Sequence, residues 1–264
     1  MEIIEKDERN NQIIGFKPEL NNSKINFKGK NNRLICEENV KLYNSNLNFN
    51  ADNSIIYLSS NRNRYFLNVS IFNNSACFID ENNYMNGTLN LILSEEKHIL
   101  IGKESIFSFG IWVRMADPHL MYDADTNQRI NFTESIYFGD HVWIGQDAFI
   151  LKGTQIGSGS IVGAKSLVSN KKISSNTVWA GNPAKEIKSN VFFDSSSVHA
   201  YTQQQTINSI TYDSNEWIYE EKGDILNFND IDEKLSKMNV DEKKEFLLEI
   251  RNNNAHNRFF TNNI

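Results

Sequence analysis

A histidine near the middle of the chain stands in a setting suited to acid–base chemistry. His119 follows Asp117 and Pro118 in a polar, turn-forming stretch. A neutral imidazole titrates close enough to neutral pH to take a proton from an attacking hydroxyl group. A loop histidine that only hydrogen-bonds a turn is the structural alternative. Asp117 either orients the imidazole or caps the turn at Pro118.

Trp143 is the second candidate, because its large indole stands directly before the apolar residue Ile144. The indole N–H is a hydrogen-bond donor only, so it can hold an oxygen on which negative charge develops during a reaction. A backbone amide can fill the same role. An indole that covers the outside of the fold is the structural alternative.

The secondary structure that must position these residues can be inferred from a six-residue repeat in the sequence. Apolar residues recur at every sixth position in the run Phe132, Phe138, Ile144, Ile150, Ile156, Val162 and Val168, and earlier at Ile101, Phe107 and Val113. Small or apolar residues lie two positions before members of the run, at Ile136, Val142, Ala148, Thr154, Ser160 and Ser166. A helix repeats about every 3.6 residues and a strand every 2, so neither explains this period.

A period of six predicts a coil of triangular cross-section. Each hexad forms one side, its apolar residue fills the interior, and three hexads complete a turn that stacks on the next turn. Glycine and other small residues suit the corners, where the backbone bends. The predicted fold is mainly β, a left-handed parallel β-helix of hexapeptide repeats with an irregular, partly helical C-terminal extension.

The chain is predicted to divide near residue 189. Residues 1–189 form the β-helix domain, and residues 190–264 form the extension. The six-residue rhythm breaks after Val113, which predicts a protruding loop at about 116–131. Loops on rigid scaffolds often carry chemistry.

Two further segments are predicted in less regular form. Residues from about 190 to 228 look like irregular strands, and residues 229–251 look like two short helices, the second capped by Asn239 or Asp241. Its apolar stripe would consist of Phe246, Leu247 and Ile250. Before residue 100, segments that begin at Asn32, Asn53 and Asn74 recur at equal spacing. They predict early coils with asparagine at the corners, since asparagine tolerates left-handed turns.

Composition and charge exclude several classes of protein. The net charge of −6 argues against general nucleic-acid binding. No run approaches the roughly 20 apolar residues of a membrane span, so no integral membrane contact is expected. The N-terminal sequence lacks the layout of a signal peptide, which predicts a cytoplasmic protein. Cys36 and Cys77 lie in apolar stretches and are expected to be buried free thiols.

Three short runs, at 142–145, 163–168 and 180–185, resemble the hexapeptide-repeat acetyltransferases. The resemblance covers roughly residues 30–190 and implies a homotrimer that binds acetyl-CoA between neighbouring β-helices. The segment 117–119, followed by Trp143, is most similar to bacterial capsule-polysaccharide O-acetyltransferases, including those that act on sialic-acid polymers. It implies that His119 is catalytic and that Trp143 lies beside the acetyl group.

The resemblance also implies where acetyl-CoA binds. Its pantetheine arm needs small residues along the coils, and its phosphates need cations. The predicted cofactor-binding residues are Trp143, Gly145, Ala164, Lys165, Ser166, Lys171, Trp179, Asn182, Pro183 and Lys185. Glu186 is the only acidic residue between residues 152 and 188, so the lysines of this stretch make it locally basic. The structural alternative is that these lysines form only a solvated face, which is more often the case for a run of charges.

Alternative functions are acetylation of a monomeric sugar or amino sugar, and a β-helix scaffold without activity. Zinc carbonic anhydrases share this kind of coil but need three histidine ligands. The five histidines here show no pair at close ligand spacing, so no metal is expected. The leading prediction is an acetyl-CoA-dependent O-acetyltransferase that acetylates hydroxyl groups of a bacterial capsular polysaccharide containing sialic acid. The polysaccharide acceptor is the expected partner, and the expected location is the inner face of the membrane, with the capsule-synthesis machinery. A polyanionic acceptor would need local cations. Two stretches supply these cations. The first contains Lys24, Lys28, Lys30 and Arg33, and the second contains the lysines between residues 152 and 188.

Overall fold

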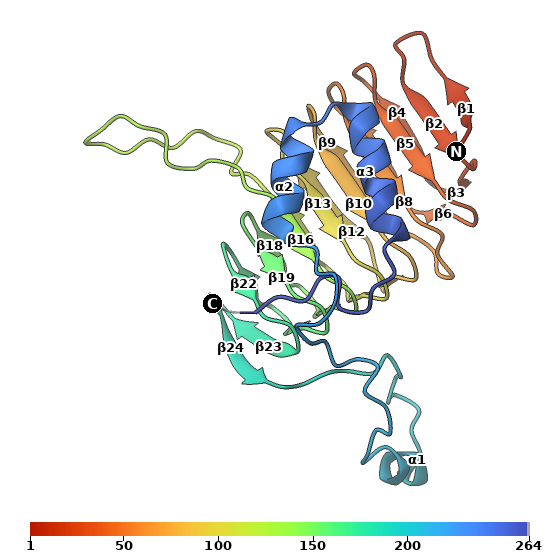
Figure 1. Ribbon diagram of the computed structural model, residues 1–264, viewed down its shortest axis with the longest axis vertical. Helices are drawn as coiled ribbons and strands as arrows, with labels where there is room; N and C mark the ends of the chain where they lie inside the picture. Colours follow the sequence, from red (N-terminus) through yellow and green to blue (C-terminus); the bar gives the residue numbers. More distant parts are fainter. Residues whose placement is uncertain (263–264) are drawn as a thin grey trace.

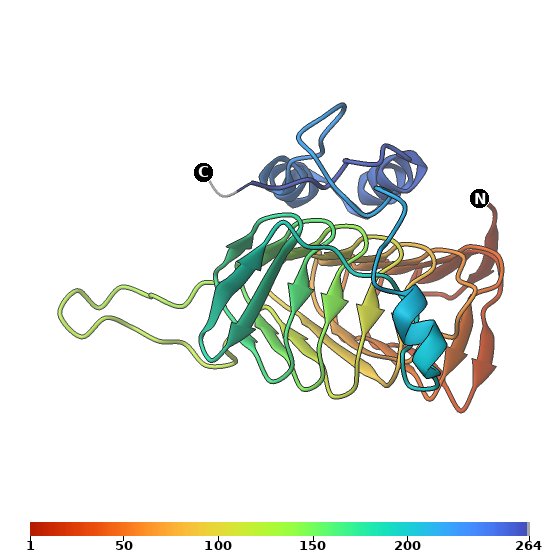
Figure 2. The same ribbon diagram turned by 90° about the horizontal axis from the view of Figure 1, so that it is seen from below.

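The computed structural model describes residues 1–262, and the last two residues of the predicted extension lie outside the described part. The chain forms a parallel β-solenoid of about seven turns with three faces, which confirms the mainly β repeat fold (Figures 1 and 2). No helix among the described residues is both long and apolar enough to cross a membrane.

We name the faces A, B and C in chain order. Face A contains β1 (Ile3–Lys6), β2 (Gln12–Gly15), β5 (Arg33–Cys36), β8 (Ile55–Leu58), β10 (Ala76–Ile79), β13 (Ile99–Ile101), β16 (Ile136–Phe138), β19 (Gln155–Ile156) and β22 (Lys172–Ile173). Only β1 is antiparallel to its neighbour in this sheet. Face C contains β4 (Lys24–Phe27), β7 (Asn46–Phe49), β9 (Leu67–Ile71), β12 (Leu89–Leu93), β15 (Trp112–Arg114), β18 (Phe149–Leu151) and β21 (Leu167–Val168).

Face B consists of two sheets. Its members are β3 (Glu19–Asn21), β6 (Lys41–Tyr43), β11 (Tyr84–Met85), β14 (Ile106–Phe107), β17 (Trp143–Ile144), β20 (Ile161–Val162), β23 (Thr177–Gly181) and β24 (Ala184–Ser189). A single bridge from Leu42 to Tyr65 continues the pairing beyond β6. After β23 the chain reverses, and β24 pairs with it in antiparallel register.

The six-residue rhythm fills the interior as predicted, with one exception. Nine of its positions are fully buried, namely Ile101, Phe107, Val113, Phe138, Ile144, Ile150, Ile156, Val162 and Val168. The prediction was wrong for Phe132, whose side chain is 61% exposed. It stands before β16, where the inserted segment has not yet rejoined the coil, and Arg129 lies over its ring at 4.9 Å.

The corners of the early coils are asparagines in left-handed conformation, which confirms the prediction for Asn53 and Asn74; in the first of these coils the left-handed residue is Asn31, and the predicted Asn32 is the buried residue after it. Asn31, Asn53 and Asn74 have φ of 57°, 57° and 53°. The Asn31 side-chain amide donates to the Asn53 side-chain oxygen Oδ1 across 2.7 Å, between residues 22 positions apart. In later coils the corresponding step is 18 residues, as from Asp140 to Ser158. Asparagine ladders thus let the longer early coils stack on one another.

The C-terminal extension is irregular before it becomes helical. The predicted strands between 190 and 228 are absent from the structure, which instead has loops and the short helix α1 (Gln203–Asn208), whose residues are all solvent-accessible. The aromatic residues of this segment pack against other rings rather than along strands. The two predicted helices are present as α2 (Phe228–Lys237) and α3 (Val240–Asn252), with Asn239 as the N-cap of α3.

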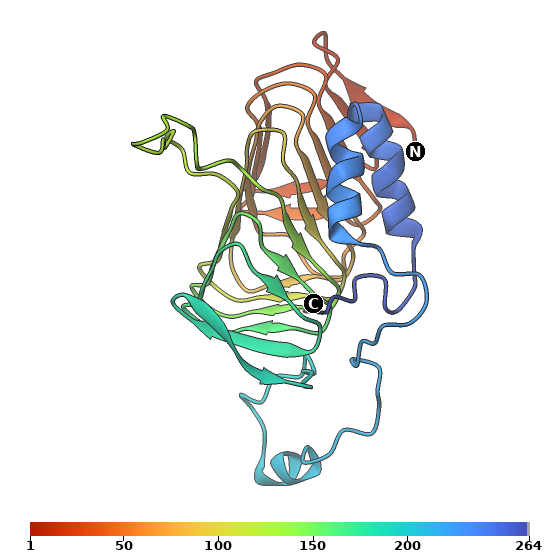
Figure 3. The ribbon, with the colours of Figure 1, turned by 60° about the vertical axis from the view of Figure 1, so that its left-hand side comes forward.

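Helices α2 and α3 cover face A and create a second core (Figure 3). Phe246, Leu247 and Ile250 are buried there, as predicted. They pack with outward residues of face A such as Tyr57 and Phe78. Because one face of the solenoid is closed in this way, faces B and C remain available for binding.

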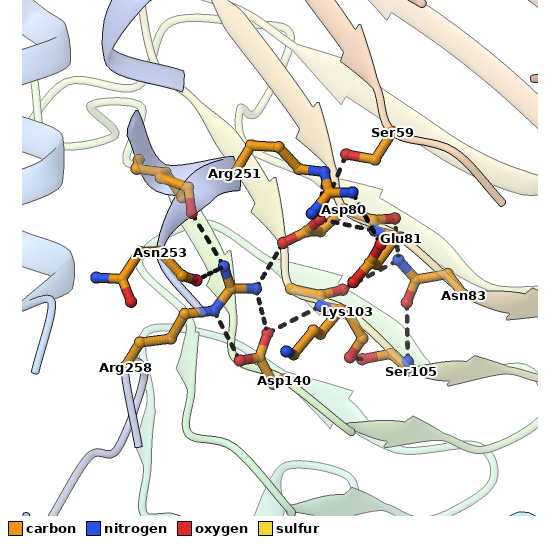
Figure 4. A network of polar contacts seen from close by, with 12 residues as sticks. Ser59, Asp80, Glu81, Asn83, Lys103, Ser105, Asp140, Arg251, Asn253 and Arg258 are labelled. Carbon is orange, nitrogen blue, oxygen red and sulfur yellow. Dashed lines mark hydrogen bonds and ion pairs between the residues drawn. The ribbon is translucent and has the colours of Figure 1, made fainter. Parts of the chain in front are cut away.

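One buried arginine fixes the extension to the coils (Figure 4). Arg258 binds Asp140 at 2.7 and 2.8 Å and Asp80 at 2.5 Å, and donates to the Ile250 and Asn253 carbonyl oxygens. Arg258, Asp80 and Asp140 are each at most 1% exposed. Burial raises the pKa of the Asp80 carboxyl, and the guanidinium opposes that shift. The ion network therefore depends on Arg258.

We expect Arg258→Met to cost about 3–5 kcal/mol of unfolding free energy, because buried Asp140 loses its counter-charge and buried Asp80 keeps only Arg251, 3.5 Å away. Urea denaturation of the purified protein measures this loss. The matched control is Lys237→Met, which breaks the exposed Lys237–Glu233 ion pair on α2 and should leave the midpoint unchanged. Equal midpoints for both variants would contradict the role assigned to the network.

Candidate active site

The segment that contains His119 leaves the solenoid between β15 on face C and β16 on face A, at the C/A corner. It extends as a narrow hairpin beyond the coils (Figure 2). Tyr122 and Arg129 form an antiparallel bridge within it, and the Asp123 carboxylate accepts the amides of Asp125 and Thr126 at the turn. These contacts give the hairpin an internal structure.

The base of this hairpin is fixed to the coils. Asn131 is buried, and its side chain accepts from the Met121 amide at 2.9 Å and donates to the His119 carbonyl oxygen at 2.7 Å. Arg129 binds Glu95 of the adjacent coil through two hydrogen bonds of 2.7 and 2.9 Å. The backbone of His119 is therefore held in place while its imidazole is exposed.

Asp117 pairs with a lysine instead of the imidazole. Its carboxylate accepts from Lys152 at 2.7 Å, and this hydrogen bond lowers the pKa of Asp117. The structure thus places the carboxylate against the coil surface, where it helps to anchor the hairpin. No hydrogen bond joins Asp117 to the His119 ring in the described part of the chain.

Trp143 lies on β17 and points outward from face B. The indole is 40% exposed and packs at a tilt against Phe193 of the extension, with ring centres 5.8 Å apart. The backbone amides of Trp143 and Gly145 donate to Ser160 and Val162 in the adjacent coil, at 3.0 and 2.7 Å. The indole N–H has no hydrogen-bond partner among residues 1–262, so it is free to bind an acceptor atom.

Next to Trp143, the B/C corner of three successive coils is built from very small residues. A Cβ on Gly145 would lie 2.5 Å from the Ala164 backbone nitrogen, and one on Gly163 would lie 2.9 Å from the Ala180 Cβ. The Ser166 hydroxyl accepts from the Gly181 amide at 3.2 Å. The coils therefore stack closely, and this corner has no bulky side chains. We call it the small-residue edge, because an extended molecule can lie there close to the backbone.

Cations and polar groups flank this edge, as a phosphate-bearing arm would require. Lys165, Asn182, Pro183 and Lys185 are all exposed along it. Lys165 occupies a left-handed turn with φ of 58°, and its amide donates to the Gln146 carbonyl oxygen at 2.7 Å. The structure therefore brings most of the predicted cofactor-binding residues to one corner, although Gly145 and Ser166 are buried there and only their neighbours are exposed.

Two of the predicted cofactor-binding residues lie elsewhere. Lys171 stands at the C/A corner, where its carbonyl oxygen accepts from Gln155 at 2.8 Å. Trp179 is only 9% exposed and belongs to the interior core, which it covers near the last coil. Its position favours a structural role.

The candidate residues thus form two groups on opposite sides of face C. His119 and Lys171 are at the C/A corner, whereas Trp143 is on face B, next to the small-residue edge at the B/C corner. In the described part of one chain, no hydrogen bond or ring contact joins His119 to Trp143. A single copy therefore presents two half-sites.

The sequence did not single out His141, which organises the surroundings of Trp143. Its ring is stacked between Phe193 and Trp217, with centroid distances of 4.0 and 3.7 Å. Its Nε2 lies 2.9 Å from the Phe193 carbonyl oxygen and so donates to it. Burial lowers the pKa of His141, which favours the neutral ring. The one signal in the sequence is a histidine at a corner that in other coils carries asparagine, glutamate or glycine.

No protein-family model matches this sequence, and no curated protein matches it. Solved structures do resemble it. The polySia-specific acetyltransferase NeuO has a TM-score of 0.64 and 25% identity, over 75% of this chain and 92% of that one. The polysialic acid O-acetyltransferase OatWY has a TM-score of 0.56 and 24% identity, over 75% of this chain and 98% of that one.

The solenoid and these similarities support an acyltransferase, and the chain resembles solved members of the hexapeptide-repeat family. Among solved members, its fold is similar to two enzymes whose names specify polysialic acid. At 24–25% identity, the acceptor of this chain has to be argued from its own residues.

We expect Asn131→Ala to loosen the hairpin, because the backbone at His119 and Met121 loses its buried partner at a local cost of about 1–3 kcal/mol. Hydrogen–deuterium exchange should rise in residues 116–131 and stay unchanged in the coils. Gln128→Ala, near the hairpin turn, is the control and should leave the exchange pattern as in the wild type. Unaltered exchange in Asn131→Ala would show that the hairpin is fixed by other contacts.

Proposed function

We propose that the protein is an acetyl-CoA-dependent O-acetyltransferase that acetylates hydroxyl groups of a sialic-acid-containing bacterial capsular polysaccharide. The observation that supports it most is the pair of half-sites, an exposed histidine on a fixed hairpin and an exposed indole above a small-residue edge. The similarity to two polysialic acid acetyltransferases supports the choice of acceptor.

The B/C corner fits the donor. At this corner Ala164 is exposed, while Gly145 and Ser166 are buried beneath it, and the absence of bulky side chains there suits an extended pantetheine arm that lies close to the backbone. Lys165 and Lys185 are exposed beside it and supply positive charge for phosphate groups. Trp143 stands at one end of the small-residue edge, where the thioester would lie.

His119 acts as general base in this reaction. Its imidazole takes the proton of the sugar hydroxyl as the hydroxyl oxygen attacks the thioester carbonyl carbon. A new C–O bond forms, the C–S bond breaks, and His119 passes the proton to the departing thiolate. The Trp143 indole N–H stabilises the carbonyl oxygen as charge develops, because the nearby amides of Trp143 and Gly145 are already used between coils.

A homotrimer would join the two half-sites. Face A is covered by α2 and α3, so the free faces are B and C. Three triangular solenoids with face C turned towards one axis place the B/C corner of each copy beside the C/A corner of the next. His119 of one copy would then meet Trp143 of its neighbour.

The apolar surface of the chain supports this arrangement. On face C the outward row changes from Asn46, Asn68 and Asn90 to Trp112, Phe149 and Leu167 in the last coils. The Trp112 and Phe149 rings stack at 6.5 Å. The hairpin adds five apolar residues that are each more than half exposed, Leu120, Met121, Tyr122, Ile130 and Phe132. Exposed apolar residues in such number are typical of a protein interface.

The proposed location is the cytoplasm, at the inner face of the membrane beside the capsule-synthesis machinery. Acetyl-CoA is a cytoplasmic donor. Cys36 and Cys77 are buried free thiols, as predicted, and reduced cysteines are typical of that compartment.

We expect His119→Ala to lower kcat by about a hundred- to ten-thousandfold, because the hydroxyl loses its base. Acetyl transfer from labelled acetyl-CoA to polysialic acid measures the rate, and calorimetry measures donor affinity, which should stay close to that of the wild type. More than a tenth of wild-type kcat in this variant would remove His119 from the role of base.

We expect Trp143→Ala to lower both kcat and donor affinity, and we expect a mixture of the two inactive variants to regain activity. When His119→Ala and Trp143→Ala chains are co-expressed and assemble at random, about one interface in four contains an intact pair. Co-expression of two differently tagged His119→Ala chains is the control and should stay inactive. No recovery in a mixed trimer would place both residues in one subunit's site.

A further inference from the structure

Two adjoining hollows follow the A/B corner of the solenoid. The first, of about 460 Å³, is bordered by Tyr84, Ile106 and Trp217, among others. The second, of about 340 Å³, is bordered by Asn39 and Lys41. Arg62 and Asn82 border both hollows. They therefore form one continuous groove, which we call the A/B groove.

The A/B groove leads to Trp143. Strand pairing places Tyr84 beside Ile106, and Ile106 beside Trp143, in one outward row of face B. Tyr84 is 46% exposed. From Trp143 the groove runs towards the N-terminal coils, whereas the small-residue edge runs towards the C-terminal coils. A molecule in the groove would therefore approach the acetyl group from the side opposite the donor.

One wall of the groove comes from the C-terminal extension. Ser195, Ser197 and Trp217 border the larger hollow. Asn176 of the coils donates to the Trp217 carbonyl oxygen at 2.9 Å, and Trp217 stacks on His141 at 3.7 Å. The irregular segment between β24 and α2 is thus fixed where it encloses the groove.

The charges in the groove favour an anion. In the described part of the chain, neither Arg62 nor Lys41 has a carboxylate within ion-pair distance. Glu81, which borders the smaller hollow, is already bound by Arg251 at 2.8 Å. Glu104 is the remaining acid, and burial raises its pKa. Two unpaired cations therefore stand against one half-buried carboxyl group.

We propose that the A/B groove binds the acceptor chain, as a series of consecutive sugar units that carry carboxylates. This inference rests on the proposed function and adds to it the path of the polysaccharide. Arg62 binds a sugar carboxylate, for which a planar guanidinium offers two parallel hydrogen bonds. Asn39 and Asn82 offer amides to hydroxyl and N-acyl groups, and Tyr84 offers an aromatic face to a sugar ring.

The length of the groove predicts how activity depends on chain length. From β6, which carries Lys41, to β17, which carries Trp143, there are four coil steps of about 4.8 Å, or about 19 Å. Several sugar units are needed to reach from the reacting hydroxyl to Arg62 and Lys41. Chains long enough to fill the groove should therefore have lower KM than single sugars or dimers.

The basic stretch at Lys24–Arg33 is the rival surface, and the structure weakens it. Arg33 is buried and pairs with Asp241 of the extension at 3.0 Å. Lys28 donates to the Asn50 side chain at 2.9 Å. Lys24 begins β4 on face C, which is away from Trp143. The expectation that these four residues form one cationic patch was wrong, because Arg33 is not accessible.

The test compares Arg62→Gln and Tyr84→Ala with the wild type, using α2,8-linked sialic acid chains of defined length and labelled acetyl-CoA. We expect Arg62→Gln to raise KM for long chains about ten- to hundredfold, because a charge-assisted hydrogen bond is lost. Tyr84→Ala should raise it about fivefold. KM for acetyl-CoA and kcat at saturating chain should stay unchanged. Wild-type preference for long chains should disappear in Arg62→Gln.

Lys24→Gln removes the same charge from the rival surface and should leave every parameter as in the wild type. A wild-type enzyme that acetylates long chains, together with unchanged KM in Arg62→Gln and Tyr84→Ala, would overturn the groove and leave the proposed function intact. A raised KM in Lys24→Gln alone would assign the chain to the rival surface. A wild-type enzyme that acetylates only neutral glycans would overturn both proposals.

Discussion

Every coil of the solenoid shares its backbone hydrogen bonds with the coils on either side, so chain can be added or removed only at the corners. An insertion within a side would shift the inward and outward positions of every following residue. The hairpin of His119 accordingly enters at the C/A corner, and the smallest residues gather at the B/C corner. The A/B corner carries the groove that leads to Trp143. The repeat therefore decides where functional groups can stand.

The buried polar groups have a different role, because they fix the C-terminal extension, which has no repeat, to the coils of the solenoid. Arg258 binds Asp80 and Asp140 with both carboxylates fully buried, and the two helices settle on face A around it. Such a network is costly to desolvate, so its main benefit is a single docked position for the extension. That position is also what places Trp217 beside His141 and completes a wall of the groove.

Much of the fold and part of the site could be predicted because both follow from a short repeat in the sequence. The interior residues from Phe138 to Val168 recur at every sixth position, and the asparagine corners recur after 22 residues from Asn31 to Asn53 and 21 from Asn53 to Asn74. Phe132 was misplaced because an insertion hides where the period resumes. The strands expected after residue 190 failed because their aromatic residues pack on His141 and other distant rings, and no local pattern encodes such contacts. Arg33 likewise needed its partner Asp241, 208 residues away, to be recognised as buried.

His141 connects the catalytic and the acceptor-binding parts of the proposed site. Its ring lies between Phe193, which packs on Trp143, and Trp217, which borders the A/B groove. A charged imidazole would be unfavourable between two rings that exclude water, and burial lowers its pKa accordingly. The neutral ring therefore keeps both aromatic residues stacked. Since Phe193 and Trp217 belong to the same extension, movement of that segment would alter the groove and the surroundings of the indole together. The extension is thus positioned to couple occupancy of the groove to the geometry at Trp143.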